Sequence, residues 1–309
     1  MDFAPLPCEH AREWGFWMGF MVDETGPRDS TARPGNTVMR VTFWGTRGSI
    51  PCSGLSYLRY GGSTSCVELR CGDHLMVFDG GSGIRNLGEQ LIDDPPGLID
   101  IFLSHCHFDH VCGLPFFAPF HLGSVRLRLW GGRFDDGLTT EAMLASFMMP
   151  PFFPVTPDVF RAAIEYRDFR AGDTLHPATG IEVETVRLHH PQGATGYGVS
   201  YRGAKVCYLT DTEAGPGGLD PEFVRVARRA DILIADSMFT DAELSACAGW
   251  GHQSWRQAIE LADAAEVRTL VLFHHHPMHD DTFMDAVARE ARAMRPDVIV
   301  ARENLTLEV

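Results

Sequence analysis

The sequence lacks any apolar run of about 20 residues, the length a helix needs to cross a bilayer. The longest candidate near the start, Trp14 to Val22, is too short, and its upstream flank carries Asp2 and Glu9. No small-residue cleavage site follows it. We therefore expect neither a membrane-spanning segment nor a secretory signal.

Lysine is almost absent, since Lys205 is the only lysine in 309 residues. Acidic residues outnumber lysine plus arginine by 41 to 26, and the formal net charge is −15. A protein that binds long nucleic acid needs a basic face that releases counterions from the phosphates. The charge balance argues against such a partner, although an acidic protein can still carry a local basic pocket for a small anion.

Paired metal-binding or redox cysteines are also lacking, because the eight cysteines form no C-x-x-C motif. Several fall in apparent strands, which is typical of reduced, structural thiols, and we expect a cytoplasmic protein. Hydrophobic residues make up 45% of the chain and charged residues 22%. This composition predicts an ordinary soluble protein with a sizeable core.

Residues 1–37 differ in character from the rest of the chain. An aromatic stretch at 14–20 is followed by a polar segment with glycine and proline at 23–36. We predict an N-terminal extension and linker over 1–37 and one folded domain over 38–309. The extension would pack on the domain or on a second subunit, so a homodimer stays open.

Strand patterns come in quick succession after residue 38 and alternate with helix patterns later in the chain. The predicted strands cover 38–44, 66–71, 74–79, 98–104, 125–130, 181–188, 198–201, 205–210, 232–236, 269–273 and 298–301. The predicted helices cover 85–92, 221–230, 254–264 and 282–294. This order indicates an α/β protein, built either as two mixed sheets between helices or as one doubly wound sheet.

The segment H-x-H-x-D-H directly follows the predicted strand 98–104 and supplies His105, His107, Asp109 and His110. Three imidazoles and a carboxylate within six residues are a dense set of metal ligands. On a loop leaving a strand, the first two histidines can point one way while the other two residues turn to an adjacent position. The pattern suits two neighbouring metal ions. A solvated histidine-rich stretch would not lie between a core strand and an apolar turn.

Further ligands are available at the ends of three other predicted strands. They are the segments His189-His190-Pro191, Thr210-Asp211-Thr212 and His274-His275-His276-Pro277. Strand ends on one edge of a sheet converge in space, which is where α/β proteins generally build their sites. We therefore expect these segments to complete the two metal sites.

Taken together, these segments resemble the metallo-β-lactamase superfamily. More narrowly, the chain is similar to the phosphodiesterase-type branch that includes ribonuclease Z and the cyclic-phosphate phosphodiesterases. Segments 43–51, 60–66, 78–81 and 251–254 also resemble that branch, and the resemblance covers roughly residues 38–285. It implies an αββα sandwich of two mixed β-sheets flanked by helices.

The resemblance also implies a set of ligands. One metal ion would be held by His105, His107 and His190, and the other by Asp109, His110 and His274, with Asp211 bridging the two. His190 is preferred to His189 because it directly precedes a proline, and His274 to its two neighbours because it follows the strand. We expect two divalent ions, with zinc favoured by the imidazole-rich ligands and manganese as the alternative.

Two such ions can share a water and turn it into hydroxide near neutral pH, and Asp109 could both ligate and orient that hydroxide. His252 lies in a Gly-His-Gln-Ser segment directly before the predicted helix 254–264. It resembles the segment whose histidine donates a proton to the reacting phosphate or leaving group, so we predict Asp109 and His252 as catalytic residues. The alternative is that Ser254 caps the helix and His252 is merely nearby.

The leading hypothesis is a metal-dependent phosphodiesterase acting on a small substrate such as a cyclic phosphodiester. A ribonuclease Z-like endonuclease is the first alternative, but the resemblance would then imply a long basic arm, and no such insertion is present. Lactone or thioester hydrolysis on the same metal core is the second, and a non-catalytic binding protein is the third. The aromatic and proline-rich segment 116–157 would form an apolar wall beside the metals or a dimer contact.

Overall fold

The computed structural model describes residues 38–132, 137–215 and 217–309. The predicted N-terminal extension lies outside these residues, so that division of the chain stays a prediction. Within the described ranges, no helix is long and apolar enough to cross a membrane.

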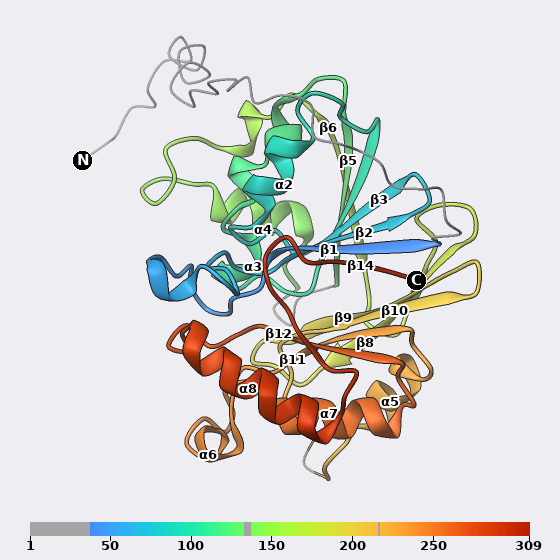
Figure 1. The fold of residues 1–309 in the computed structure, drawn as a ribbon. Coiled ribbons are helices and arrows are strands. Elements are labelled where there is room, and N and C mark those ends of the chain that lie inside the picture. Colours follow the sequence, from blue (N-terminus) through green and yellow to red (C-terminus); the bar gives the residue numbers. More distant parts are fainter. Residues whose placement is uncertain (1–37, 133–136, 216) are drawn as a thin grey trace. The chain divides into compact units, whose positions relative to one another are not determined.

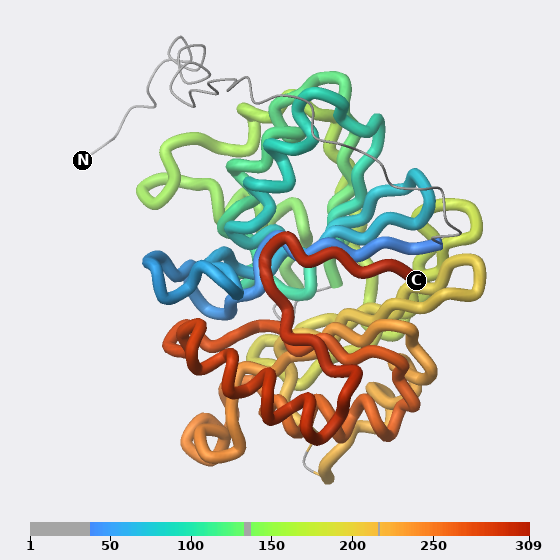
Figure 2. Tube along the Cα trace, in the orientation of Figure 1, coloured from blue at the N-terminus to red at the C-terminus, as the bar shows by residue number. Residues whose placement is uncertain are grey.

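The first sheet carries seven strands in the described part of the chain, in the spatial order β14-β1-β2-β3-β4-β5-β6. Their bounds are β1 Met39–Gly45, β2 Cys66–Cys71, β3 His74–Phe78, β4 Leu98–Leu103, β5 Arg126–Gly132, β6 Ala163–Phe169 and β14 Thr306–Glu308. Neighbours from β14 to β3 are antiparallel, and those from β3 to β6 are parallel. The last strand therefore pairs with the first strand of the sandwich, as Figure 2 shows for the red and blue ends of the trace.

The second sheet has the order β13-β12-β11-β10-β9-β8-β7. Its strands are β7 Thr174–Leu175, β8 Ile181–Leu188, β9 Ala194–Tyr201, β10 Ala204–Leu209, β11 Ile232–Asp236, β12 Thr269–Phe273 and β13 Ile299–Val300. Strands β10 to β13 run parallel, whereas β7 to β10 alternate in direction. Strands β8, β10, β11 and β12 therefore all end at one edge.

Helices cover the outer face of each sheet, as Figure 1 shows. Helices α2 (Ile84–Gln90), α3 (Phe108–Val111) and α4 (Thr140–Phe147) pack on the first sheet, and α5 (Pro221–Ala227), α7 (Trp255–Ala264) and α8 (Asp281–Met294) on the second. A third apolar cluster fills the space between the sheets. The αββα sandwich is confirmed, and the alternative of one doubly wound sheet is wrong.

The remaining helices are single turns in loops. They are α6 (Asp241–Leu244), η2 (Leu55–Tyr57), η3 (Leu114–Phe116), η4 (Ala118–His121) and η5 (Pro157–Val159). The predicted strands and helices are confirmed with small shifts at their ends. The largest shift is in β9, which begins at Ala194 and includes Gly196, where an added Cβ would lie 2.5 Å from the Leu209 side chain.

Candidate active site

The residues predicted as metal ligands all lie at one edge of the sandwich. His105 and His107 follow β4, and the short helix α3 adds Asp109 and His110. The others come from the second sheet, where His190 follows β8, Asp211 follows β10 and His274 follows β12. Because these strands end at a common edge, residues up to 165 positions apart in sequence become neighbours.

Three of these histidines form a first group. His190 Nε2 lies 3.0 Å from His107 Nδ1. The ring centre of His105 lies 4.4 Å from that of His107 and 4.6 Å from that of His190. One nitrogen of each ring therefore points to a common centre, and all three lie within 4.8 Å of one another.

The other nitrogen of each ring in this group is held by a hydrogen bond. The partners are Ser104 Oγ at 3.0 Å for His105, Gln192 Oε1 at 2.8 Å for His107 and the Gly251 carbonyl at 2.8 Å for His190. Such bonds fix the ring orientation and leave the inward nitrogen free to bind a metal. Gly251 has φ +85°, and an added Cβ would lie 2.1 Å from His190 Nδ1, so only glycine fits beside that ring.

A second, fully buried group consists of Asp109, His110, Asp211 and His274. His274 Nε2 lies 3.0 Å from Asp109 Oδ2 and 3.2 Å from Asp211 Oδ1. His110 Nε2 lies 3.2 Å from the same Asp109 oxygen. Two imidazoles and two carboxylates thus surround one point.

Asp211 lies between the two groups. Its Oδ2 is 3.3 Å from His110 Nε2 in the second group. The same oxygen is 3.6 Å from His105 Nε2 and 3.8 Å from His190 Nε2 in the first. This is the placement expected of a carboxylate that bridges two ions.

The donor set fits two divalent cations. His105 Nε2 is buried and has no hydrogen-bond partner among the described residues, although it faces the carboxylate of Asp211. Burial, with the nearby charge of His110, lowers the pKa of His105 well below its ordinary value, which favours the neutral, metal-binding form. Buried carboxylates without cations would be costly, whereas imidazole and carboxylate ligands suit zinc or manganese.

Asp79 orients the His110 ring through Nδ1, the nitrogen that does not face the other predicted ligands. Its Oδ2 accepts hydrogen bonds from His110 Nδ1 at 2.8 Å and from the Tyr208 hydroxyl at 2.7 Å. Its Oδ1 accepts one from the Ser104 backbone N–H at 2.7 Å. Burial by itself would lower the pKa of His110, but the carboxylates of Asp211, Asp109 and Asp79 outweigh it and raise that pKa.

Three of the residues that follow strands have a positive φ angle, a backbone conformation that residues other than glycine rarely adopt. The φ angles are 62° for Asp79, 53° for Asp211 and 63° for His274. Such residues cost free energy and persist where the surrounding structure holds them, often at functional sites. Here the left-handed turn directs each side chain into the cluster instead of along its strand.

His252 lies against both groups. Its ring centre is 5.0 Å from that of His274 and 5.2 Å from that of His190, and its side chain is buried. Nδ1 donates to Asp236 Oδ2 at 2.7 Å. Burial opposes protonation, but the nearby carboxylates, Asp236 first, raise the pKa of His252 to about 9.

Ser254 does cap α7, because its hydroxyl accepts from the Gln257 backbone N–H. The cap and the predicted role of His252 are compatible, since the same turn that starts the helix positions the histidine. Asp236, at the end of β11, was not predicted from the sequence. It ends a strand at the same edge as Asp211, and the strand-end argument could have found it.

The neighbouring histidines point elsewhere. His189 Nε2 pairs with Asp220 at 2.7 Å. His275 Nε2 donates to the Ala301 carbonyl, and the His276 ring packs near Phe239. The structure therefore brings His190 and His274 into the cluster, as predicted.

An aromatic surface adjoins the metal cluster on the side of His107. Phe108 follows this histidine, is 56% exposed and lies 6.5 Å, centre to centre, from Phe147 of α4. Phe147 in turn lies 6.5 Å from Phe153, and Phe152 is 92% exposed. The segment between β5 and β6 thus places apolar side chains at the rim of the site.

The family is decided by comparison with known proteins. Residues 76–275, about two thirds of the chain and including every predicted ligand, match the model of the Beta-lactamase superfamily domain. The chain belongs to the metallo-β-lactamase superfamily. With both groups of candidate ligands present, it is a metal-dependent hydrolase of that superfamily.

Individual members of the superfamily are only distantly similar. A ribonuclease Z of Crocosphaera subtropica is 25% identical, over 88% of this chain and 98% of its own length. The metallo-β-lactamase fold protein YhfI of Bacillus subtilis aligns with TM-score 0.68 at 20% identity, over 88% of this chain and 99% of that one. A diphosphatase of the PhnP family aligns with TM-score 0.63 at 16% identity, over 88% and 98%. The two structural likenesses show the fold alone.

Proposed function

We propose that this protein is a phosphodiesterase that hydrolyses a small phosphodiester, with a cyclic diester as the favoured substrate. His105, His107 and His190 would hold one divalent ion, and Asp109, His110 and His274 the other, with Asp211 shared. When bound, the two ions would supply Lewis acidity toward a phosphoryl oxygen and lower the pKa of a bound water. Zinc is the favoured metal, with manganese as the alternative.

The observation that carries the proposal is the position of His252. A buried imidazole held by Asp236, in contact with one predicted ligand of each ion, is placed to give a proton to a departing alkoxide. Asp109 supports the other half of the reaction. Its Oδ2 accepts the Ser49 backbone N–H at 2.7 Å, which holds the carboxylate where it can orient an attacking water.

Charge and surface favour a small substrate. The chain has a single lysine and a net charge of −15. Within 137–162, the described part of the segment that borders the site, Arg161 is the one basic residue. Such a surface offers aromatic contacts to a base or another apolar group and little attraction for a polyanion.

A ribonuclease Z-like activity on RNA precursors is the second candidate. It is favoured by the curated relatives, which are named ribonuclease Z and match this chain over nearly their whole length at 22 to 26% identity. Both candidate activities would use the same metal cluster, and they differ in the substrate that binds beside it.

The two candidates predict different outcomes in one competition. We expect the zinc-loaded full chain to hydrolyse bis(p-nitrophenyl) phosphate and cyclic nucleotides, with rates that change little between 50 and roughly 200 mM salt, because few phosphates are contacted. A transfer-RNA precursor with a 3′ trailer should bind weakly and stay intact. Tight, salt-sensitive binding and cleavage of that RNA would establish the second candidate and overturn the first.

A further inference from the structure

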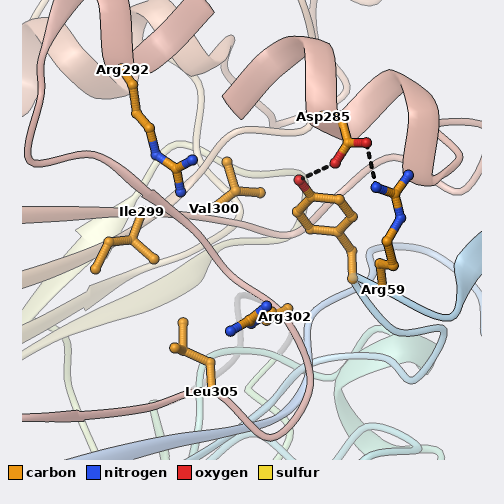
Figure 3. Close-up of a pocket in the computed structure, with 8 residues that line it drawn as sticks. Arg59, Asp285, Arg292, Ile299, Val300, Arg302 and Leu305 are labelled. Atoms are coloured by element: carbon orange, nitrogen blue, oxygen red, sulfur yellow. Dashed lines mark hydrogen bonds and ion pairs between the residues drawn. The ribbon is translucent and has the colours of Figure 1, made fainter. Parts of the chain in front are cut away.

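A second pocket lies outside the metal cluster, between the loop that contains η2, helix α8 and the C-terminal segment. Its volume is about 470 Å³, within the range typical of small-molecule sites. It is lined by Arg59, Tyr60, Asp285, Arg292, Ile299, Val300, Arg302 and Leu305 (Figure 3). None of these residues belongs to either group of predicted metal ligands.

The pocket is positively charged in an acidic protein. Three arginines and one carboxylate line it, whereas the whole chain has 26 basic and 41 acidic residues. Asp285 is already engaged, because Arg59 pairs with it and the Tyr60 hydroxyl donates to its Oδ1 at 3.0 Å. Arg292 and Arg302 have no carboxylate partner in the described part of the chain. Arg292 Nε donates to the Val298 carbonyl at 3.4 Å, so the terminal nitrogens of Arg292 and the guanidinium group of Arg302 are left for a ligand.

These two arginines come from different elements. Arg292 belongs to α8, and Arg302 follows β13. Figure 3 shows Arg292 and Arg302 on opposite sides of Ile299 and Val300, with Leu305 beyond Arg302. The pocket therefore combines two planar hydrogen-bond donors with an apolar wall.

We propose that this pocket binds a small phosphate monoester. Guanidinium groups bind phosphate oxygens through paired N–H donors. Two guanidinium groups carry two positive charges, which match a phosphate dianion better than a singly charged carboxylate. Ile299, Val300 and Leu305 would contact the organic part of the ester. The proposal stands on this pocket alone and does not depend on the reaction at the metals.

The pocket is a separate site that shares a wall with the metal-binding region. Tyr60 lines it, and the same ring meets the His275 ring edge-on at 6.1 Å between centres. His275 is the residue after His274. A ligand in this pocket would thus be separated from the predicted metal ligand His274 by the rings of Tyr60 and His275.

Calorimetric binding of phenyl phosphate to the zinc-loaded full chain tests the proposal. Arg292→Gln and Arg302→Gln should each weaken binding about tenfold or more, because each removes charge-assisted hydrogen bonds to the phosphate. Arg268→Gln removes the same charge from a side chain that is 76% exposed and does not line the pocket, and the affinity of this variant should match wild type. Both pocket arginines are exposed, so the melting temperatures of all variants should agree.

The competing results are distinct. Equal affinity in wild type and in the Arg292→Gln/Arg302→Gln double variant would overturn the proposal, since the phosphate would then be held at the metals or elsewhere. Absence of any binding to wild type would overturn it as well. Benzoate, with one carboxylate on the same ring, should bind more weakly than phenyl phosphate. Equal or tighter benzoate binding would refute the assignment of a phosphate ester.

Discussion

Replacing Asp211 with asparagine should lower the metal content from about two ions per chain to less than one and abolish hydrolysis. The carboxylate of Asp211 lies within 3.2 to 3.8 Å of four of the five histidines proposed as ligands, so no other single change reaches both sites. Loss of a residue that merely supports a ligand costs about 10- to 100-fold in metal affinity, and loss of a shared ligand should cost more. Elemental analysis after desalting, with hydrolysis of bis(p-nitrophenyl) phosphate, measures both effects.

Asp73→Asn is the matched control for this variant. Asp73 is exposed in the turn between β2 and β3, so the same chemical change should leave metal content and activity at wild-type values. Near-ultraviolet circular dichroism of both variants in excess chelator checks that the fold is retained. An Asp211→Asn protein that keeps two tightly bound ions would show that the carboxylate is not shared between them.

Replacing His252 with alanine should leave the metal content unchanged and reduce hydrolysis by about 10²- to 10⁴-fold. The reduction should depend on the leaving group. A cyclic nucleotide expels an alkoxide that needs a proton, whereas bis(p-nitrophenyl) phosphate expels a stable phenolate, so the cyclic nucleotide should suffer the larger loss. The ratio of the two losses separates proton donation from a general disturbance of the site.

His176→Ala provides the control for His252, because His176 is exposed on the loop after β7. Asp236→Asn should show a smaller loss with the same dependence on the leaving group, since Asp236 acts through His252. If His252→Ala retained wild-type rates on both diesters, the assignment of His252 as the proton donor would be wrong. Hydrolysis of a lactone or thioester that is insensitive to His252 would support carboxylic ester chemistry instead.

The metal cluster could be predicted from the sequence because its residues are tied to recognisable strands. H-x-H-x-D-H follows the apolar strand β4, and the other ligands follow β8, β10 and β12. Strand direction then brings these ends together without any knowledge of side-chain contacts. The choice of His190 over His189 also followed from local pattern, and the structure places His190 in the first group.

The partners of the predicted ligands were harder to find. Gln192 lies in an irregular loop, and nothing in its sequence context links it to His107. Helix α4 and strand β6 were missed for different reasons, because α4 lies in a segment rich in aromatic residues and prolines and β6 is an edge strand with mostly polar, half-exposed side chains. The arginine pocket was also beyond sequence reasoning, since Arg59 and Asp285 are 226 positions apart.

Zinc titration of chelator-treated protein, followed by hydrolysis of bis(p-nitrophenyl) phosphate, tests the central claim of a two-metal hydrolase most directly. We predict no hydrolysis without metal, a rise as zinc is added, and a plateau at about two zinc ions per chain. A rate that is the same before and after zinc, or a plateau at a single ion, would contradict the two-metal account.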